Sequence, residues 1–136
     1  NAEQKIQTNK IFGRDPSSEG ERKYMEANRF EQFGDRVTAL DKYKAIVTLL
    51  KNEEKDRAFV NLARRQIATI ESQPPSADEL RRFLQERLDE ADKKYSNGDL
   101  LGAKQIWDSI ISLYNGNKEM LSLVERAQGK LNKIKE

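Results

Sequence analysis

Residues 27–40 have the sequence ANRFEQFGDRVTAL, and residues 91–104 have the sequence ADKKYSNGDLLGAK. When Ala27 is aligned with Ala91, both stretches contain an alanine, then Gly-Asp, then a second alanine at the same spacing. This alignment of the two halves is hereafter the repeat register. Glycine tolerates the left-handed backbone that ends many helices, and aspartate is a preferred N-cap of a following helix. Each stretch therefore predicts a tight turn between two helices, and together they predict an internal repeat.

The repeat register matches further residues on both sides of these turns. The identical pairs are Ala27 and Ala91, Ala39 and Ala103, Ile46 and Ile110, Leu49 and Leu113, Val60 and Val124, and Ala63 and Ala127. Tyr43 matches Trp107, and Phe59 matches Leu123, so large residues are exchanged for large ones. The matches concentrate at turns and at expected inward positions, which is where a shared fold would place them.

Apolar residues recur at helical spacing along the chain, and no stretch alternates as a strand would. We predict helices at residues 19–33, 36–50, 53–72, 77–96, 100–114 and 118–134. Ser18 and Ser76 each precede a glutamate at capping-box spacing, Asn117 is a further expected cap, and Pro74-Pro75 ends the third helix. The predicted fold class is all-α, with six antiparallel helices in two tandem three-helix units. These units cover residues 18–73 and 76–136, after a linker or N-terminal arm at residues 1–17.

Composition limits the possible functions. The chain has 25 Lys and Arg against 23 Asp and Glu, so its net charge of +2 gives little long-range attraction for nucleic acid or an anionic membrane. Without cysteine or histidine it has no disulfide, no thiolate nucleophile and no Cys/His metal site, and it lacks the commonest general base. No apolar run approaches the roughly 20 residues that span a bilayer. We therefore expect no enzyme, no cofactor, no metal, no nucleic-acid partner and no membrane insertion.

The chain begins Asn1-Ala2 rather than with Met, which favours a mature form or an excised piece of a longer protein. Absence of cysteine does not fix the compartment, so we expect a soluble domain that is either cytoplasmic or extracytoplasmic.

The repeated pattern resembles the tetratricopeptide repeat, in a divergent form. The residues that carry the resemblance are Ala27, Phe30, Gly34, Asp35, Ala39 and Tyr43, and in the second half Ala91, Tyr95, Gly98, Asp99, Ala103 and Trp107. The stretch Phe59–Ala63 is similar to the opening of a next repeat. The resemblance implies paired antiparallel helices in a right-handed superhelix, with a groove lined by the first helix of each pair. It also implies a protein or peptide partner.

We therefore predict a protein–protein interaction or scaffold module that binds a peptide or a partner helix. The expected binding face lies on the first and third helices and consists of Tyr24, Asn28, Arg57, Val60 and Arg64. The corresponding stripe of the second half, ranked lower, is Leu88, Asp92, Leu121 and Val124. The other aromatic residues, Trp107 among them, have the helical spacing of core residues. The alternative function is a structural spacer, or a self-associating regulatory domain that forms a homodimer.

Overall fold

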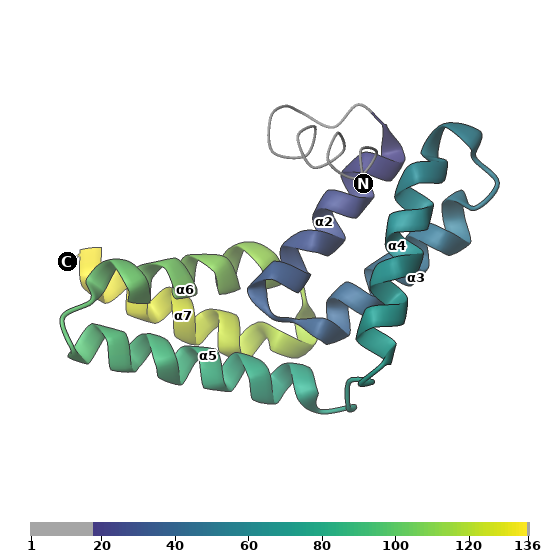
Figure 1. Cartoon of the computed structure of the whole chain (residues 1–136). Helices are drawn as coiled ribbons and strands as arrows, with labels where there is room; N and C mark the ends of the chain where they lie inside the picture. Colours follow the sequence, from purple (N-terminus) through teal and green to yellow (C-terminus); the bar gives the residue numbers. More distant parts are fainter. Residues whose placement is uncertain (1–17, 136) are drawn as a thin grey trace. The chain divides into compact units, whose positions relative to one another are not determined.

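The computed structural model of the chain describes residues 18–135, and within this range it is helical throughout (Figure 1). The α-helices are α2 (Glu19–Phe33), α3 (Arg36–Leu50), α4 (Arg57–Glu71), α5 (Glu79–Ser96), α6 (Leu100–Tyr114) and α7 (Leu121–Lys135). Two single-turn 3₁₀ helices, η1 (Glu54–Asp56) and η2 (Lys118–Met120), precede α4 and α7. The all-helical prediction is confirmed for this range, whereas the arm expected at residues 1–17 lies outside it.

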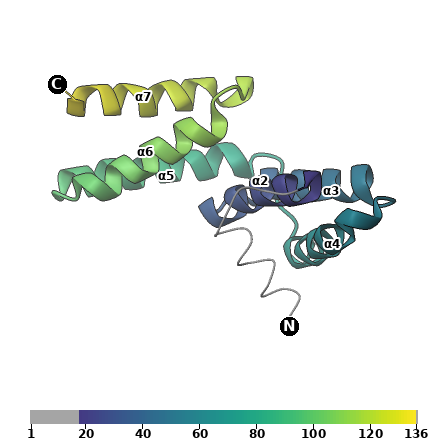
Figure 2. The same cartoon turned by 90° about the horizontal axis from the view of Figure 1, so that it is seen from above.

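The chain divides into two compact units, Asn1–Ser76 and Ala77–Glu136, hereafter unit 1 and unit 2. Unit 1 contains α2, α3 and α4, and unit 2 contains α5, α6 and α7 (Figure 2). In both units each helix packs against the next, and the first helix also contacts the third. The bounds of α3, η1 and α4 correspond to those of α6, η2 and α7 in the repeat register.

The turn after the first helix is built in the same way in both units. Gly34 and Gly98 have positive φ angles of 108° and 87°, which glycine adopts without a Cβ clash. The Asp35 carboxylate then accepts a hydrogen bond of 2.9 Å from the Thr38 amide. Asp99 does the same with the Gly102 amide at 2.8 Å. The Gly-Asp pairs therefore act as the sequence predicts, as a helix stop followed by an N-cap.

The predicted bounds of the other helices need small corrections. The third and sixth predicted helices each begin with a 3₁₀ turn before the α-helix starts. The fourth begins at Glu79 rather than residue 77, and Asp78 stands at its N-cap without a side-chain capping bond. Ser18 does cap α2, since its hydroxyl accepts from the Glu21 amide at 3.1 Å. Residues 77 and 78, where the helix was expected to begin, form a turn instead.

Small residues lie where the helices meet. The alanines of the repeat are all fully buried, namely Ala27, Ala39, Ala63, Ala91, Ala103 and Ala127. Each unit also encloses large apolar side chains, with Tyr43 and Ile46 in unit 1 and Trp107 and Ile110 in unit 2. A short side chain at a helix crossing lets two backbones approach closely, so these alanines set the spacing of each unit.

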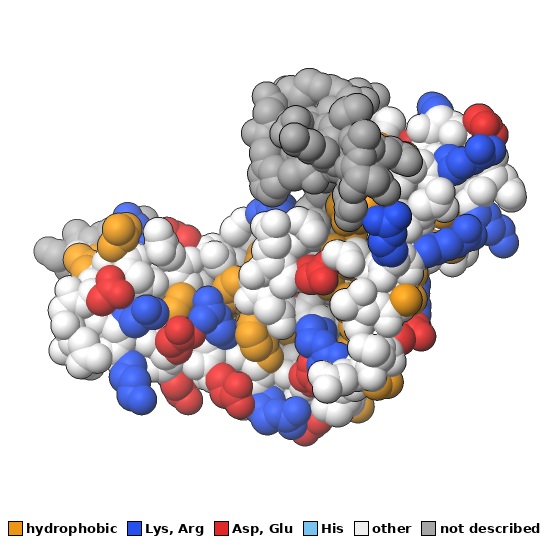
Figure 3. All heavy atoms as spheres, viewed as in Figure 1, with side chains coloured by type: hydrophobic (Ala, Val, Ile, Leu, Met, Phe, Trp, Pro, Cys, Tyr) orange, Lys and Arg blue, Asp and Glu red, His pale blue; other side chains and the backbone are white. Residues whose placement is uncertain are grey.

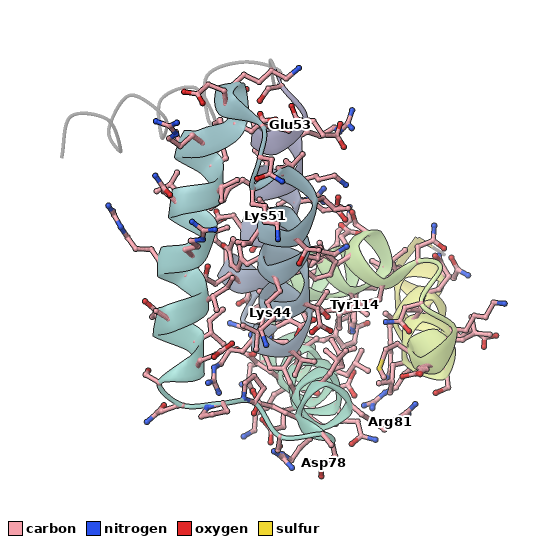
Figure 4. The ribbon with its side chains drawn as sticks, turned by 90° about the vertical axis from the view of Figure 1, so that its right-hand side faces the viewer. Lys44, Lys51, Glu53, Asp78, Arg81 and Tyr114 are labelled. Carbon is pink, nitrogen blue, oxygen red and sulfur yellow. The ribbon has the colours of Figure 1, made fainter. Side chains whose placement is uncertain are left out.

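Polar links join the outer parts of each unit. The Lys44 ammonium lies 3.1 Å from the Glu71 carboxylate and connects α3 to α4. Arg81 donates a hydrogen bond to the Glu119 carbonyl oxygen and connects α5 to η2. Lys44 and Arg81 are labelled in Figure 4. Such links are exposed and contribute little each, so burial of the apolar side chains dominates the stability.

The surface carries charges of both signs. On the face seen in Figure 3, basic and acidic side chains are interspersed over each unit. None of the helices in the described range is long and apolar enough to cross a bilayer. Nor does any group of three or more Asp and Glu side chains among residues 18–135 have the arrangement of a metal site.

Candidate binding site

Two of the five residues predicted to form a binding face on α2 and α4 are buried. Tyr24 is only 7% exposed and Val60 only 3%, so the expectation that both lie on an accessible surface is wrong. The Tyr24 ring lies 5.5 Å from the Tyr43 ring and 6.1 Å from that of Phe59, centroid to centroid. These are ordinary packing distances for aromatic pairs. Tyr24 therefore fills the interior of unit 1.

The polar residues of that face have separate positions. Arg57 is exposed and lies 2.9 Å from the Glu54 carboxylate, three residues earlier in the chain. Arg64 is exposed on α4. Asn28 is half-buried, and its amide donates to the Tyr43 hydroxyl at 3.3 Å. The five predicted residues therefore do not form one surface. Tyr24 and Val60 are buried, and Asn28 makes an interior hydrogen bond. Arg57 and Arg64 are exposed on α4.

Asn28 belongs to a hydrogen-bonded chain that joins all three helices of unit 1. The Tyr43 hydroxyl on α3 donates to the Glu31 carboxylate on α2 at 2.6 Å. The Gln66 amide on α4 donates to the same carboxylate oxygen at 3.1 Å. Burial raises the pKa of Tyr43 above its ordinary value, and the hydrogen bond to Glu31 raises it further. The neutral phenol is therefore the form that this chain of hydrogen bonds stabilises.

Unit 2 has different residues at all four of these positions. In the repeat register, Asn28, Glu31, Tyr43 and Gln66 correspond to Asp92, Tyr95, Trp107 and Lys130. The Trp107 indole N–H is buried and has no hydrogen-bond partner within the described residues. The chain of hydrogen bonds that joins the three helices of unit 1 is therefore not reproduced in unit 2.

A cavity of about 280 Å³ opens at these positions in unit 2. It is hereafter called the α5–α7 cavity. The residues that line it are Asp92, Tyr95, Ser96, Trp107, Lys130, Lys133 and Ile134. They come from the last turns of α5, the middle of α6 and the last turns of α7. The Tyr95 and Trp107 rings lie 6.1 Å apart at an angle of 50°. Tyr95 is 53% exposed, so its ring is an accessible aromatic surface at the cavity.

The charges at the cavity are partly compensated. The Asp92 carboxylate lies 2.9 Å from the Arg126 guanidinium and 3.4 Å from the Lys130 ammonium. Arg126 also pairs with Asp89 at 3.1 Å. Lys133 is exposed and forms no ion pair within the described residues. Three cations against two carboxylates leave this edge of unit 2 with a small positive excess.

The lower-ranked stripe lies partly at this cavity. Of its four residues only Asp92 lines the cavity. Leu88 is fully buried, Val124 is half-buried, and Leu121 is 56% exposed. Trp107 is 1% exposed, which confirms the prediction that it is a core residue.

Tyr95, Lys130 and Lys133 were not recognised as site residues from the sequence. The available signal was the repeat register itself, since each of them replaces a residue of different chemistry in unit 1. A position that changes character between two copies of one fold marks a difference in function or packing.

No family model, no curated protein and no solved structure matches the chain.

Proposed function

We propose that the chain is a tetratricopeptide-like protein-interaction module, and that the α5–α7 cavity receives a side chain of a bound peptide or partner helix. The single observation that carries this proposal is the accessible cavity, with its exposed Tyr95 ring, at positions where unit 1 has hydrogen-bonded side chains instead.

Three features support the tetratricopeptide-like part of the proposal. Both units pair their helices in the same order, and both place a positive-φ glycine between the first two helices. Buried alanines stand at matched positions on all three helices of each unit. In this arrangement α5 and α7 are the first helices of successive pairs, and the cavity lies between them.

Peptide recognition fits the site better than catalysis does. The cavity is lined by aromatic, aliphatic and cationic side chains, and its one carboxylate is already paired with two cations. A small pocket that a partner's aromatic side chain can fill and desolvate is a common form of anchor site in protein interfaces.

In the test, peptides that bind the whole chain are selected from a random displayed library. The affinity of the selected peptides is then measured for two matched variants of the chain. Ser96→Phe places a ring at the cavity, and Gln32→Phe places the same ring at the corresponding exposed position of unit 1. We expect selected peptides to bind Ser96→Phe about tenfold more weakly, a loss of about 1.4 kcal/mol, and to bind Gln32→Phe unchanged. Equal binding to both variants, or no enriched peptide, would contradict the proposal.

A further inference from the structure

We infer that the α5–α7 cavity takes one aromatic side chain from an acidic segment of a partner protein. This inference rests on the proposed function and specifies the chemistry of the partner.

The size of the cavity indicates a single side chain. Its volume of about 280 Å³ is at the lower limit of small-molecule pockets, which typically measure roughly 300–1,000 Å³. Only seven residues line it, and they include the last turns of two helices rather than an enclosed interior. One large side chain that projects from a partner's backbone fits this space, with the backbone outside along α5 and α7.

The lining favours an aromatic ring over other side chains. Tyr95 presents about half of its surface, already tilted against Trp107, and Ile134 lines the same cavity from α7. A ring that enters here meets the Tyr95 face and an aliphatic side chain. Aromatic pairs in tilted or offset arrangements contribute beyond the area that they bury.

The charges favour carboxylates beside that ring, and they also determine on which side. Asp92 would repel a carboxylate placed near α5, although Arg126 and Lys130 offset its charge. Lys133 lies on α7 three residues after Lys130 and has no ion pair within the described residues. The acidic residues of the partner therefore lie along α7, near Lys133. Because these lysines are accessible to solvent, their contribution depends on salt.

The test uses a synthetic five-residue peptide with phenylalanine between two glutamates on each side. Its N-terminus is acetylated and its C-terminus amidated, so that no terminal carboxylate contributes. Trp107 is the only tryptophan of the chain and lines the cavity, so its fluorescence reports occupancy directly. We expect a saturable change with this peptide. Binding should be about tenfold weaker when the phenylalanine is alanine, and also when the glutamates are lysines.

Two charge reversals on unit 2 then locate the acidic residues. We expect Lys133→Glu to weaken the acidic peptide about threefold to tenfold at low salt, with a smaller effect at high salt. Lys104→Glu makes the same charge change at an exposed position of α6 that does not line the cavity, and it should leave binding unchanged.

Three outcomes would overturn the inference. These are equal binding of the lysine-flanked peptide, equal effects of Lys133→Glu and Lys104→Glu, and no binding of the acidic peptide at all. Binding of free 3-phenylpropionate as tight as that of the peptide would overturn it as well, because it would indicate a small-molecule site. The library selection with Ser96→Phe and Gln32→Phe judges the proposed function separately, because those peptides are not chosen for charge.

Discussion

The two units share one plan of helices, yet they complete their interiors with different chemistry. Where the first and third helices end, unit 1 has the hydrogen-bonded Asn28, Tyr43 and Glu31, and unit 2 has the α5–α7 cavity. Arg36 also donates to the Ile70 carbonyl at 3.2 Å and joins α3 to the end of α4. Its counterpart, Leu100, has no guanidinium and cannot make this bond.

At the other end of each unit, where the first helix begins, it is unit 2 that has the apolar interior. In unit 1 the buried Asp56 carboxylate accepts from the Gly20 amide at 3.2 Å, at the start of α2. The corresponding residues of unit 2 are Met120 and Leu84, which are 5% and 0% exposed. Unit 2 thus has an apolar core at the end where unit 1 has a buried carboxylate. The two units therefore share a backbone arrangement, whereas a few substitutions decide which end of each unit is well packed.

The largest expected effect comes from the apolar end of unit 2. Leu84→Ala removes a fully buried side chain, and we expect it to lower the free energy of unfolding by about 2–5 kcal/mol. Denaturant unfolding followed by Trp107 fluorescence measures this loss. The control, Leu121→Ala, changes a leucine that is 56% exposed, and it should remain within about 0.5 kcal/mol of the parent chain. A small effect of Leu84→Ala would show that this end is not the packed one.

The next largest loss of stability is expected from a substitution of Gly20, because the absence of a side chain there leaves room for Asp56. A Cβ atom at Gly20 would lie 2.6 Å from the Asp56 Oδ1 atom, which already accepts from the Gly20 amide. We expect Gly20→Ala to cost about 1–3 kcal/mol in thermal or denaturant unfolding. The control is Gly129→Ala on α7, where nothing lies within 4 Å of the new Cβ. This variant should be about 0.5–1 kcal/mol more stable, because alanine favours helix. Equal changes in unfolding free energy in the two variants would show that Asp56 does not need the space beside Gly20.

Removing one hydroxyl from each unit tests the hydrogen-bonded chain. Tyr43→Phe deprives the Glu31 carboxylate and the Asn28 amide of a common partner, so we expect a loss of about 1–2 kcal/mol. Tyr95→Phe removes a hydroxyl that has no hydrogen bond within the described residues, and its effect should stay within about 0.5 kcal/mol. Hydrogen exchange, measured segment by segment, should place the first loss in unit 1. If both variants behave alike, the hydrogen bonds of Tyr43 do not stabilise unit 1.

The smallest expected difference between the units is a loss of stability of unit 1 at alkaline pH. At neutral pH this loss is absent. Burial raises the pKa of Tyr24 above its ordinary value of 10.0, and the nearby Glu31 charge raises it further. The pKa of Tyr43 is raised as well, mainly by burial. The folded chain therefore holds these protons more tightly than the unfolded chain does. Their contribution to stability is complete below pH 10 and is lost progressively as the pH rises above it.

Unfolding curves between about pH 8 and pH 12 measure this loss. The Tyr24→Phe, Tyr43→Phe double variant should show a smaller decline above pH 10 than the parent chain. A decline of the same size in both would mean that other groups cause it.

Local signals in the sequence determined the helices of this protein. The apolar spacing, the Gly-Asp turns and the caps Ser18 and Asn117 are local signals, since each depends on residues within one or two turns of helix. For the same reason α2, α3 and α6 have the predicted bounds. The repeat register is also visible in the sequence, because matched turns and alanines recur at fixed spacing.

Only the tertiary structure decided which residues are accessible. Tyr24 was placed on a groove by its position on one helix, but two other helices bring Tyr43 and Phe59 against it. Tyr95 follows the same helical rules and yet is half exposed, because neither α6 nor α7 covers it fully. Burial depends on side chains distant in the sequence, and no local pattern contains that information. The α5–α7 cavity consequently follows from the packing of three helices, whereas the helices themselves follow from the sequence.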